Sequence, residues 1–126
     1  MSLIQYNFEV INPEEAHRGG SISFFCKIDF IESDNNNNFN IQITFNVKGF
    51  REDGDLFKLE EKFNAVFTKV NAKVFDNVSN KLQVKFCVSL LYPTIRENAL
   101  YTLSKAGLGQ INIPFQMPNV DIEAAD

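Results

Sequence analysis

The sequence predicts an α+β fold, in which a four-stranded antiparallel sheet is followed by one or more C-terminal helices. Four segments in the first two-thirds of the chain alternate apolar and polar residues, with the two-residue period of a half-buried strand. Turn-forming residues separate these segments, and a segment with helical spacing and helix-end signals follows them. Because short turns join antiparallel neighbours, we expect a meander or a close relative.

Each predicted strand gathers its large apolar side chains on one face. Such a face must be covered by helices or by another subunit. The turns are marked by Asn12-Pro13, Gly19-Gly20, the asparagine-rich residues 34–38 and Asp53-Gly54. The apolar faces consist of Ile4, Tyr6, Phe8 and Val10; Ile22, Phe24, Cys26, Ile28 and Phe30; Phe39, Ile41, Ile43, Phe45 and Val47; and Phe57, Leu59, Phe63 and Phe67.

The segment 81–92 is ambiguous by its own pattern. Its apolar residues alternate, and this period alone favours a strand. A family resemblance, given below, favours a helix, so both interpretations stay open here. The alternating residues are Leu82, Val84, Phe86, Val88 and Leu90.

A helix is predicted over residues 94–106. Thr94 and Glu97 fit a capping box, in which Thr94 caps the first turn and Glu97 reaches back to it. Lys105 suits the negative end of the helix dipole, and Gly107 suits a left-handed cap. We place one domain at residues 1–118 and a short, extended acidic tail at 119–126. The apolar stripe of this helix is Ile95, Ala99, Leu103 and Ala106.

The charge and the cysteines restrict the possible partners and the compartment. The net charge of −4 argues against nucleic-acid binding and against a polybasic membrane patch. The sequence shows neither a long apolar run nor a signal peptide, and we therefore expect a cytoplasmic protein. We expect Cys26 and Cys87 to be free thiols in the core, with a disulfide as the minor alternative.

The sequence gives little support for catalysis. His17 is the single histidine and lies in a predicted loop, which argues against a His-based metal site or a Ser-His-Asp triad. A Cys87–His17 nucleophile–base pair is the weakest alternative. No glycine-rich phosphate loop is present. We therefore expect no enzyme activity, no metal and no cofactor.

The aromatic composition is skewed toward one residue type. The chain has 13 Phe and no Trp. Phenylalanine is large and apolar without a polar atom, so it suits a buried core or an apolar contact surface. A chain of this size has limited interior volume, and some of the rings could instead line a groove or a subunit interface.

Residues 91–97, Leu-Tyr-Pro-Thr-Ile-Arg-Glu, resemble the signature of the SecB family of export chaperones. In that signature an aromatic-Pro pair is followed two residues on by Arg-Glu. Gly107 and residues 110–115, Gln-Ile-Asn-Ile-Pro-Phe, are similar to the short strand that follows in the family. Upstream, the resemblance covers element order and length.

The resemblance implies an ATP-independent holdase without catalytic residues. Members of the family are dimers of dimers, whose apolar grooves hold extended segments of unfolded or precursor proteins before transfer to SecA. It also implies a helix at 81–92. An acidic strand patch facing SecA would correspond to Leu59 and Glu61. From the Phe-rich strand faces and the helix beside them, we expect the peptide-binding residues of such a groove to be Phe24, Phe39, Phe45, Leu91, Tyr92 and Ile95, with plain core packing as the alternative.

The resemblance favours two possible functions over a third class of protein, which is an enzyme or a small-ligand barrel. The first is a general chaperone for unfolded or nascent polypeptides, linked to protein export. The alternative is a SecB-like chaperone dedicated to one partner, such as an antitoxin. Because the sequence stops soon after Pro118, we expect the C-terminal amphipathic helix of typical members to be absent.

Overall fold

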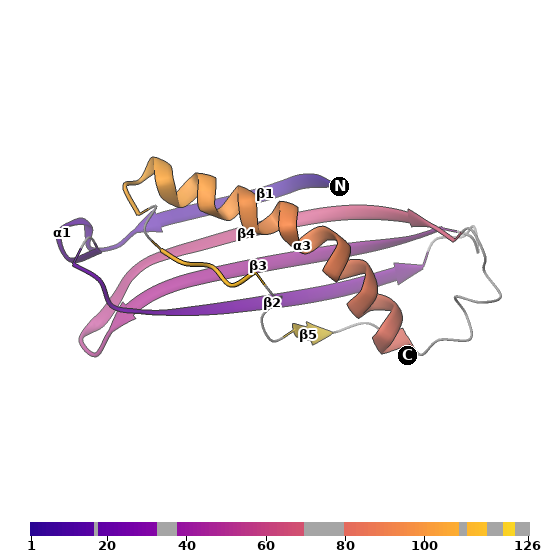
Figure 1. Cartoon of the computed structure of the whole chain (residues 1–126), viewed down its shortest axis with the longest axis horizontal. Coiled ribbons are helices and arrows are strands. Elements are labelled where there is room, and N and C mark those ends of the chain that lie inside the picture. Colours follow the sequence, from indigo (N-terminus) through magenta and orange to yellow (C-terminus); the bar gives the residue numbers. More distant parts are fainter. Residues whose placement is uncertain (17, 33–37, 70–79, 109–110, 116–119, 123–126) are drawn as a thin grey trace.

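The fold is a single antiparallel layer of long strands with one long helix lying across one of its faces (Figure 1). The computed structural model describes residues 1–16, 18–32, 38–69, 80–108, 111–115 and 120–122. His17 and most of the predicted turn at 34–38 lie outside these residues. The elements are β1 (Ser2–Val10), α1 (Pro13–Ala16), β2 (Ser21–Glu32), β3 (Asn38–Arg51), β4 (Gly54–Thr68), α3 (Asn80–Lys105) and β5 (Val120–Ile122).

The strand order in the sheet is β1-β4-β3-β2-β5. Strands β2, β3 and β4 form the predicted antiparallel meander, and β1 lies beside β4 rather than beside β2. The chain therefore crosses from one edge of the sheet to the other between β1 and β2. Arg51, at the end of β3, holds this crossing by pairing with Glu15 and by donating to the carbonyl of Gly19 at 2.8 Å.

The predicted four antiparallel strands and the following helix are confirmed, and the sheet has one strand more than predicted. Strand β5 lies within the predicted tail and pairs in parallel with the middle of β2. Residues 120–122 of the predicted extended tail therefore belong to the sheet. The outer edge of β2 offers unpaired backbone groups, and an extended segment can satisfy them.

The two faces of the sheet differ in chemistry. Directly paired residues point to the same side of a sheet, so each row of paired residues belongs to one face. One row across the sheet runs Cys26, Phe45, Glu61 and Tyr6. Its residues face α3, and the first three of them are buried. The adjacent row begins with Lys27 and continues through Thr44, Lys62 and Gln5 on the opposite, polar face. The apolar face is thus covered by α3, as the sequence predicted.

The strand interpretation of 81–92 is wrong, because these residues form the first half of α3. Val84, Cys87 and Val88 are buried against the sheet, whereas Leu82 and Phe86 are exposed. A four-residue spacing is close to one helical turn. Two apolar stripes on opposite sides of a helix therefore produce the alternation that a strand also shows.

The predicted capping box at Thr94 is also wrong, since α3 begins at Asn80 and continues through Pro93. The C-terminal end is as predicted. Gly107 has a φ of 78°, and its N–H donates to the carbonyl of Ser104 at 3.0 Å. The N–H of Leu108 donates to the carbonyl of Leu103 at 2.8 Å. This pair of bonds is a Schellman cap, which only a residue tolerant of left-handed angles forms without strain.

Candidate functional site

Most of the side chains proposed as peptide-binding residues lie in the core between the sheet and α3. Phe39, Phe45, Tyr92 and Ile95 are buried in the core, and Phe24 and Leu91 are half-buried against it. The rings of Phe45 and Tyr92 meet edge to face, with centroids 6.1 Å apart. These side chains join the sheet to the helix, and among them Tyr92 also lines a surface groove.

The exposed apolar side chains of α3 form a stripe on its outer face. Leu82, Phe86 and Leu90 follow one another at four-residue spacing, with exposed fractions of 58, 60 and 57%. Phe115, in the segment after the helix, is 83% exposed. Leu82, Phe86 and Phe115 were not among the site residues proposed from the sequence. A strand over 81–92 would place Leu82 and Phe86 on the same face as Val84 and Val88, whereas the helix separates them. The four-residue repeat was the signal that could have found the first two.

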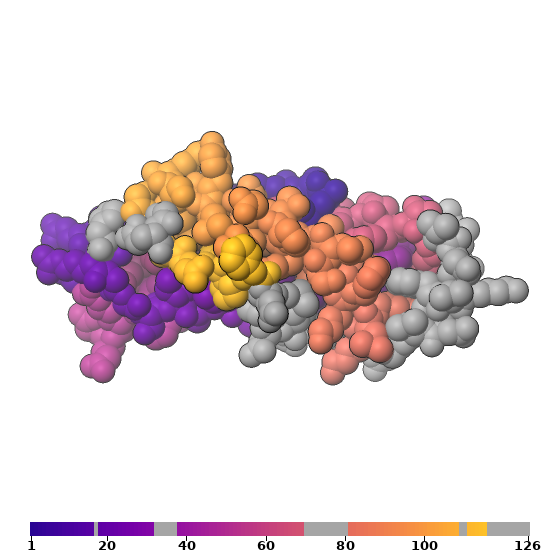
Figure 2. Space-filling model, viewed as in Figure 1, coloured from indigo at the N-terminus to yellow at the C-terminus, as the bar shows by residue number. Residues whose placement is uncertain are grey.

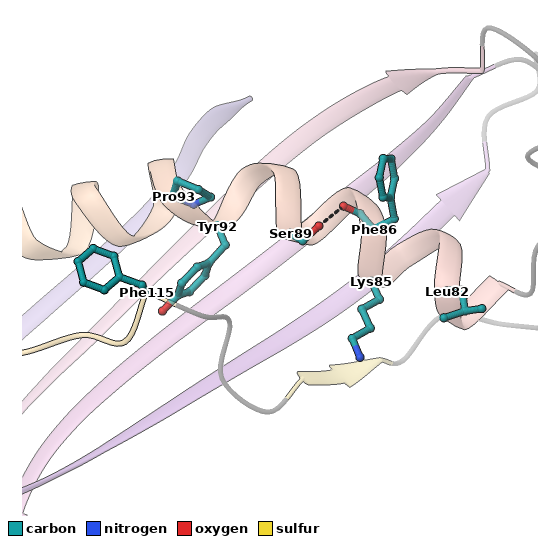
Figure 3. A pocket seen from close by; sticks show the side chains of 7 residues that line it. All are labelled: Leu82, Lys85, Phe86, Ser89, Tyr92, Pro93 and Phe115. Atoms are coloured by element: carbon teal, nitrogen blue, oxygen red, sulfur yellow. Dashed lines mark hydrogen bonds between the residues drawn. The ribbon is translucent and has the colours of Figure 1, made fainter.

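A groove of about 680 Å³ runs along the first half of α3, and Phe115 from the segment 111–115 also lines it. In Figure 3, Tyr92, Pro93 and Phe115 lie toward one end and Leu82 lies toward the other, while Lys85 points away from α3 toward β5. The Ser89 hydroxyl donates to the carbonyl of Phe86 at 2.6 Å, so its polar group is satisfied within the helix. The lining residues are Leu82, Lys85, Phe86, Ser89, Tyr92, Pro93 and Phe115.

Two side chains one helical turn apart fix the segment that carries Phe115. The Tyr92 hydroxyl donates to the carbonyl of Pro114 at 2.7 Å, and Arg96 Nε donates to the carbonyl of Ile113 at 2.9 Å. The Arg96 guanidinium lies over the Phe115 ring, 4.1 Å from its centroid, in a cation–π contact. Burial raises the pKa of the Tyr92 hydroxyl. Figure 2 shows the resulting contact, with the segment resting against the side of α3.

Pro93 lies inside α3 and shapes the same groove. Proline has no backbone N–H, so the carbonyl of Ser89 loses the hydrogen bond that residue 93 would normally donate. A proline in a helix interior also bends the helix, which here crosses the sheet diagonally (Figure 1). In the Tyr-Pro-x-x-Arg pattern, Tyr92 and Arg96 therefore dock the segment beside the helix, and Pro93 lines the groove.

Leu59 and Glu61, the residues matched to a SecA contact, are both buried under α3. Glu61 Oε2 accepts a hydrogen bond from Asn98 Nδ2 at 3.0 Å, while Oε1 is buried with no hydrogen-bond partner among the described residues. Burial raises the pKa of Glu61 from 4.5 to about 7. A partner could contact these two side chains only if α3 moved off the sheet.

The two cysteines show no sign of a reactive or metal-binding role. Cys26 and Cys87 are free and buried, as predicted, and burial raises their thiol pKa values to about 12 and about 11. Among the described residues, no group of three His, Cys, Asp or Glu side chains could hold a metal ion. No helix in the described part of the chain is both long and apolar enough to cross a bilayer.

Comparison with protein-family models gives no match, and no curated protein matches the sequence. Among solved structures, the chain is similar to the Mycobacterium tuberculosis SecB-like chaperone Rv1957, in complex with a ChAD peptide from the HigA1 antitoxin Rv1956. The match has a TM-score of 0.65 at 13% sequence identity, and it covers 90% of this chain and 85% of that one. The fold is SecB-like. The predicted likeness to the SecB family is thus supported for the fold.

The buried carboxyl of Glu61 predicts a specific pH dependence of stability. Between pH 4.5 and about 7 the folded chain keeps a proton that the unfolded chain has lost. The stabilising contribution of the neutral form is therefore complete below pH 4.5 and is lost as the pH rises through 7, by about 3 kcal/mol in all. Glu61→Gln stays neutral, so it should be more stable than wild type at pH 8 by an amount that shrinks toward pH 5.

Urea unfolding at both pH values measures this difference. Glu60→Gln is the matched control, because Glu60 is the neighbouring carboxylate on the polar face of β4, and its unfolding curves should follow the wild type. A Glu61→Gln protein that loses stability with pH as steeply as the wild type would contradict the assignment.

Proposed function

We propose that this chain is an ATP-independent chaperone that holds unfolded or nascent polypeptide segments in the groove beside α3. The observation that carries the proposal is the row of exposed apolar side chains, Leu82, Phe86 and Phe115, that lines this groove. The SecB-like fold supports it, since the similar chaperone was solved with a peptide bound. Holding a segment by apolar burial needs no nucleotide and no catalytic residue.

The geometry of the groove suits an extended chain. Leu82 and Phe86 are four residues apart on a helix, which corresponds to a rise of about 6 Å. Alternate side chains of an extended strand are about 6.6 Å apart. Successive outward side chains of the groove therefore match every second side chain of a client. Such matching asks only for apolar residues at alternate positions, which many unfolded chains offer.

The alternative is a chaperone dedicated to one partner, such as an antitoxin. The antitoxin peptide bound to the similar chaperone favours this alternative. Suppressed aggregation of several unrelated unfolded proteins would support the general holdase. Capture of one protein from native lysate, together with no effect on unrelated unfolded proteins, would support the dedicated chaperone.

We further propose that the chain forms homodimers or dimers of dimers through the free edge of β1. Strand β1 pairs with β4 on one side only. It exposes Leu3, Ile4 and Tyr6 by about half of their surface. An edge strand with apolar side chains is a template for pairing with a second copy. Export, transfer to SecA through Leu59 and Glu61, and a cytoplasmic location stay predictions.

Substitutions in the groove should separate client holding from folding. Leu82→Ala and Phe86→Ala should each weaken binding of reduced, carboxymethylated α-lactalbumin about tenfold, because each removes apolar area that a client buries. Their free energies of unfolding should change by less than about 0.5 kcal/mol, since both side chains are exposed. Isothermal titration and urea unfolding measure the two quantities.

Leu90→Ala is the matched control for Leu82→Ala. The two leucines lie on the same helix with nearly equal exposure, and only Leu82 lines the groove. Equal weakening of client binding by both variants would place the binding surface elsewhere.

The oligomer proposal predicts a dimer or tetramer in size-exclusion chromatography with light scattering. Tyr6→Lys should shift the protein toward monomer, because it puts a charge at the edge that pairs. Phe25→Lys, at a similarly exposed position on β2, is the control and should leave the mass unchanged. A monomeric wild type would overturn the proposal.

A further inference from the structure

The outer edge of β2 is only partly occupied. All 12 residues of β2 pair with β3 on the inner side. On the outer side, Cys26, Lys27 and Ile28 pair with β5. In the described part of the chain, the rest of this edge has no strand beside it. Unpaired backbone N–H and C=O groups along such an edge accept an added strand.

The segment seated on this edge belongs to the chain's own C-terminal region and is bound by a minimal contact. Strand β5 has three residues, and its pairing with β2 is the one parallel pairing recorded among the described strands. Parallel pairing is slightly weaker per residue than antiparallel pairing. A three-residue strand at a sheet edge therefore opens far more readily than the four long strands.

The occupied edge is continuous with the groove. Phe115 is docked on α3 by Arg96, and β5 begins five residues later. Figure 3 shows β5 beside the groove, with the Lys85 side chain pointing from α3 toward it. The end of the groove lined by Lys85 therefore lies beside the strand that occupies the edge of β2.

We propose that the outer edge of β2 continues the client-binding surface by strand addition, and that β5 occupies it as a built-in competitor until a client segment displaces it. This inference rests on the proposed holdase function and adds its regulation. An extended client is the occupant that fits, because the native occupant is itself an extended segment held through backbone pairing. The client and β5 then compete for the same backbone groups of Cys26, Lys27 and Ile28.

A tethered competitor weakens the apparent affinity for clients in a calculable way. The apparent dissociation constant equals the intrinsic constant divided by the fraction of molecules whose edge is free. If β5 is seated in about nine molecules of ten, freeing the edge strengthens apparent client binding about tenfold. The short connection from Phe115 keeps β5 at high effective concentration, so this competition acts at any protein concentration.

The test removes the pairing of β5 in the full-length chain. Consecutive backbone amides of a strand point to opposite sides, so Val120→Pro/Asp121→Pro removes a donor facing β2 whichever amide makes the bond. Binding of reduced, carboxymethylated α-lactalbumin should become about tenfold tighter. The control, Ala124→Pro/Ala125→Pro, places two prolines in the same tail beyond β5 and should bind like the wild type.

Two further measurements make the result independent of any single variant. Hydrogen exchange at residues 26–28 should accelerate in the Val120→Pro/Asp121→Pro protein and slow again when the client is added. A synthetic peptide of residues 116–126 should weaken client binding to this variant. Faster exchange without any gain in client affinity, or a peptide that leaves client binding unchanged, would overturn the competitor.

The outcomes separate this inference from the proposed function. Equal client binding by wild type and the proline variant, with loss of binding in Phe86→Ala, would contradict the proposal that β5 competes with clients. The proposed holdase function would still hold. Failure of every form to bind the unfolded client overturns the holdase, and the competitor with it. Tighter binding by the proline variant, abolished by Phe86→Ala, supports both.

Discussion

The packing of one face of α3 on the apolar face of the sheet is the interaction on which the rest of the structure depends. One helix covers a face built from four long strands, so its inner residues, such as Val88, Ile95 and Leu103, are completely buried. The same contact encloses Glu61, whose only described side-chain partner is Asn98 of the helix. Leu108 and Ile113, beyond the end of α3, are buried in the same core, and within the described residues the outer face of the helix stays exposed. The exposed stripe of Leu82, Phe86 and Leu90 follows from this arrangement.

Tyr92 and Arg96 of the Tyr-Pro-x-x-Arg segment act on the shape of the groove. Tyr92 belongs to the buried face through its ring, and its hydroxyl reaches the carbonyl of Pro114. Arg96 repeats this one turn later with Ile113 and covers Phe115. The spacing of four residues is what lets both side chains reach the same segment. The groove is thus lined by the helix and by Phe115 of a segment that Tyr92 and Arg96 hold in place.

Sequence reasoning predicted the parts of the fold that depend on period and turns. The strands and their apolar face followed from alternation, and the end of α3 followed from Gly107. Residues 81–92 could not be decided from period alone, since an apolar residue at every second position fits both a strand and two stripes of a helix. Thr94 fits a cap in isolation, but the continuous helix from Asn80 makes it an interior residue. Phe45 and Ile95 were proposed as groove residues, and the structure buries both side chains, because which apolar side chains are covered depends on tertiary packing that composition does not reveal. Strand β5 was missed because the pairing of three residues depends on a free edge elsewhere in the fold.

The two halves of the proposed binding surface select clients on different grounds. Exposed side chains on α3 require apolar residues at alternate positions, and this requirement alone discriminates poorly among unfolded chains. In the proposed competition, the tethered strand β5 sets a minimum binding free energy for a client. The client must gain more from backbone pairing and apolar burial than the pairing of β5 with β2 contributes. Segments that meet only one of these conditions are disfavoured, whereas long extended apolar segments meet both. Selection by length and exposure would then arise from the chain's own tail, without recognition of any particular sequence.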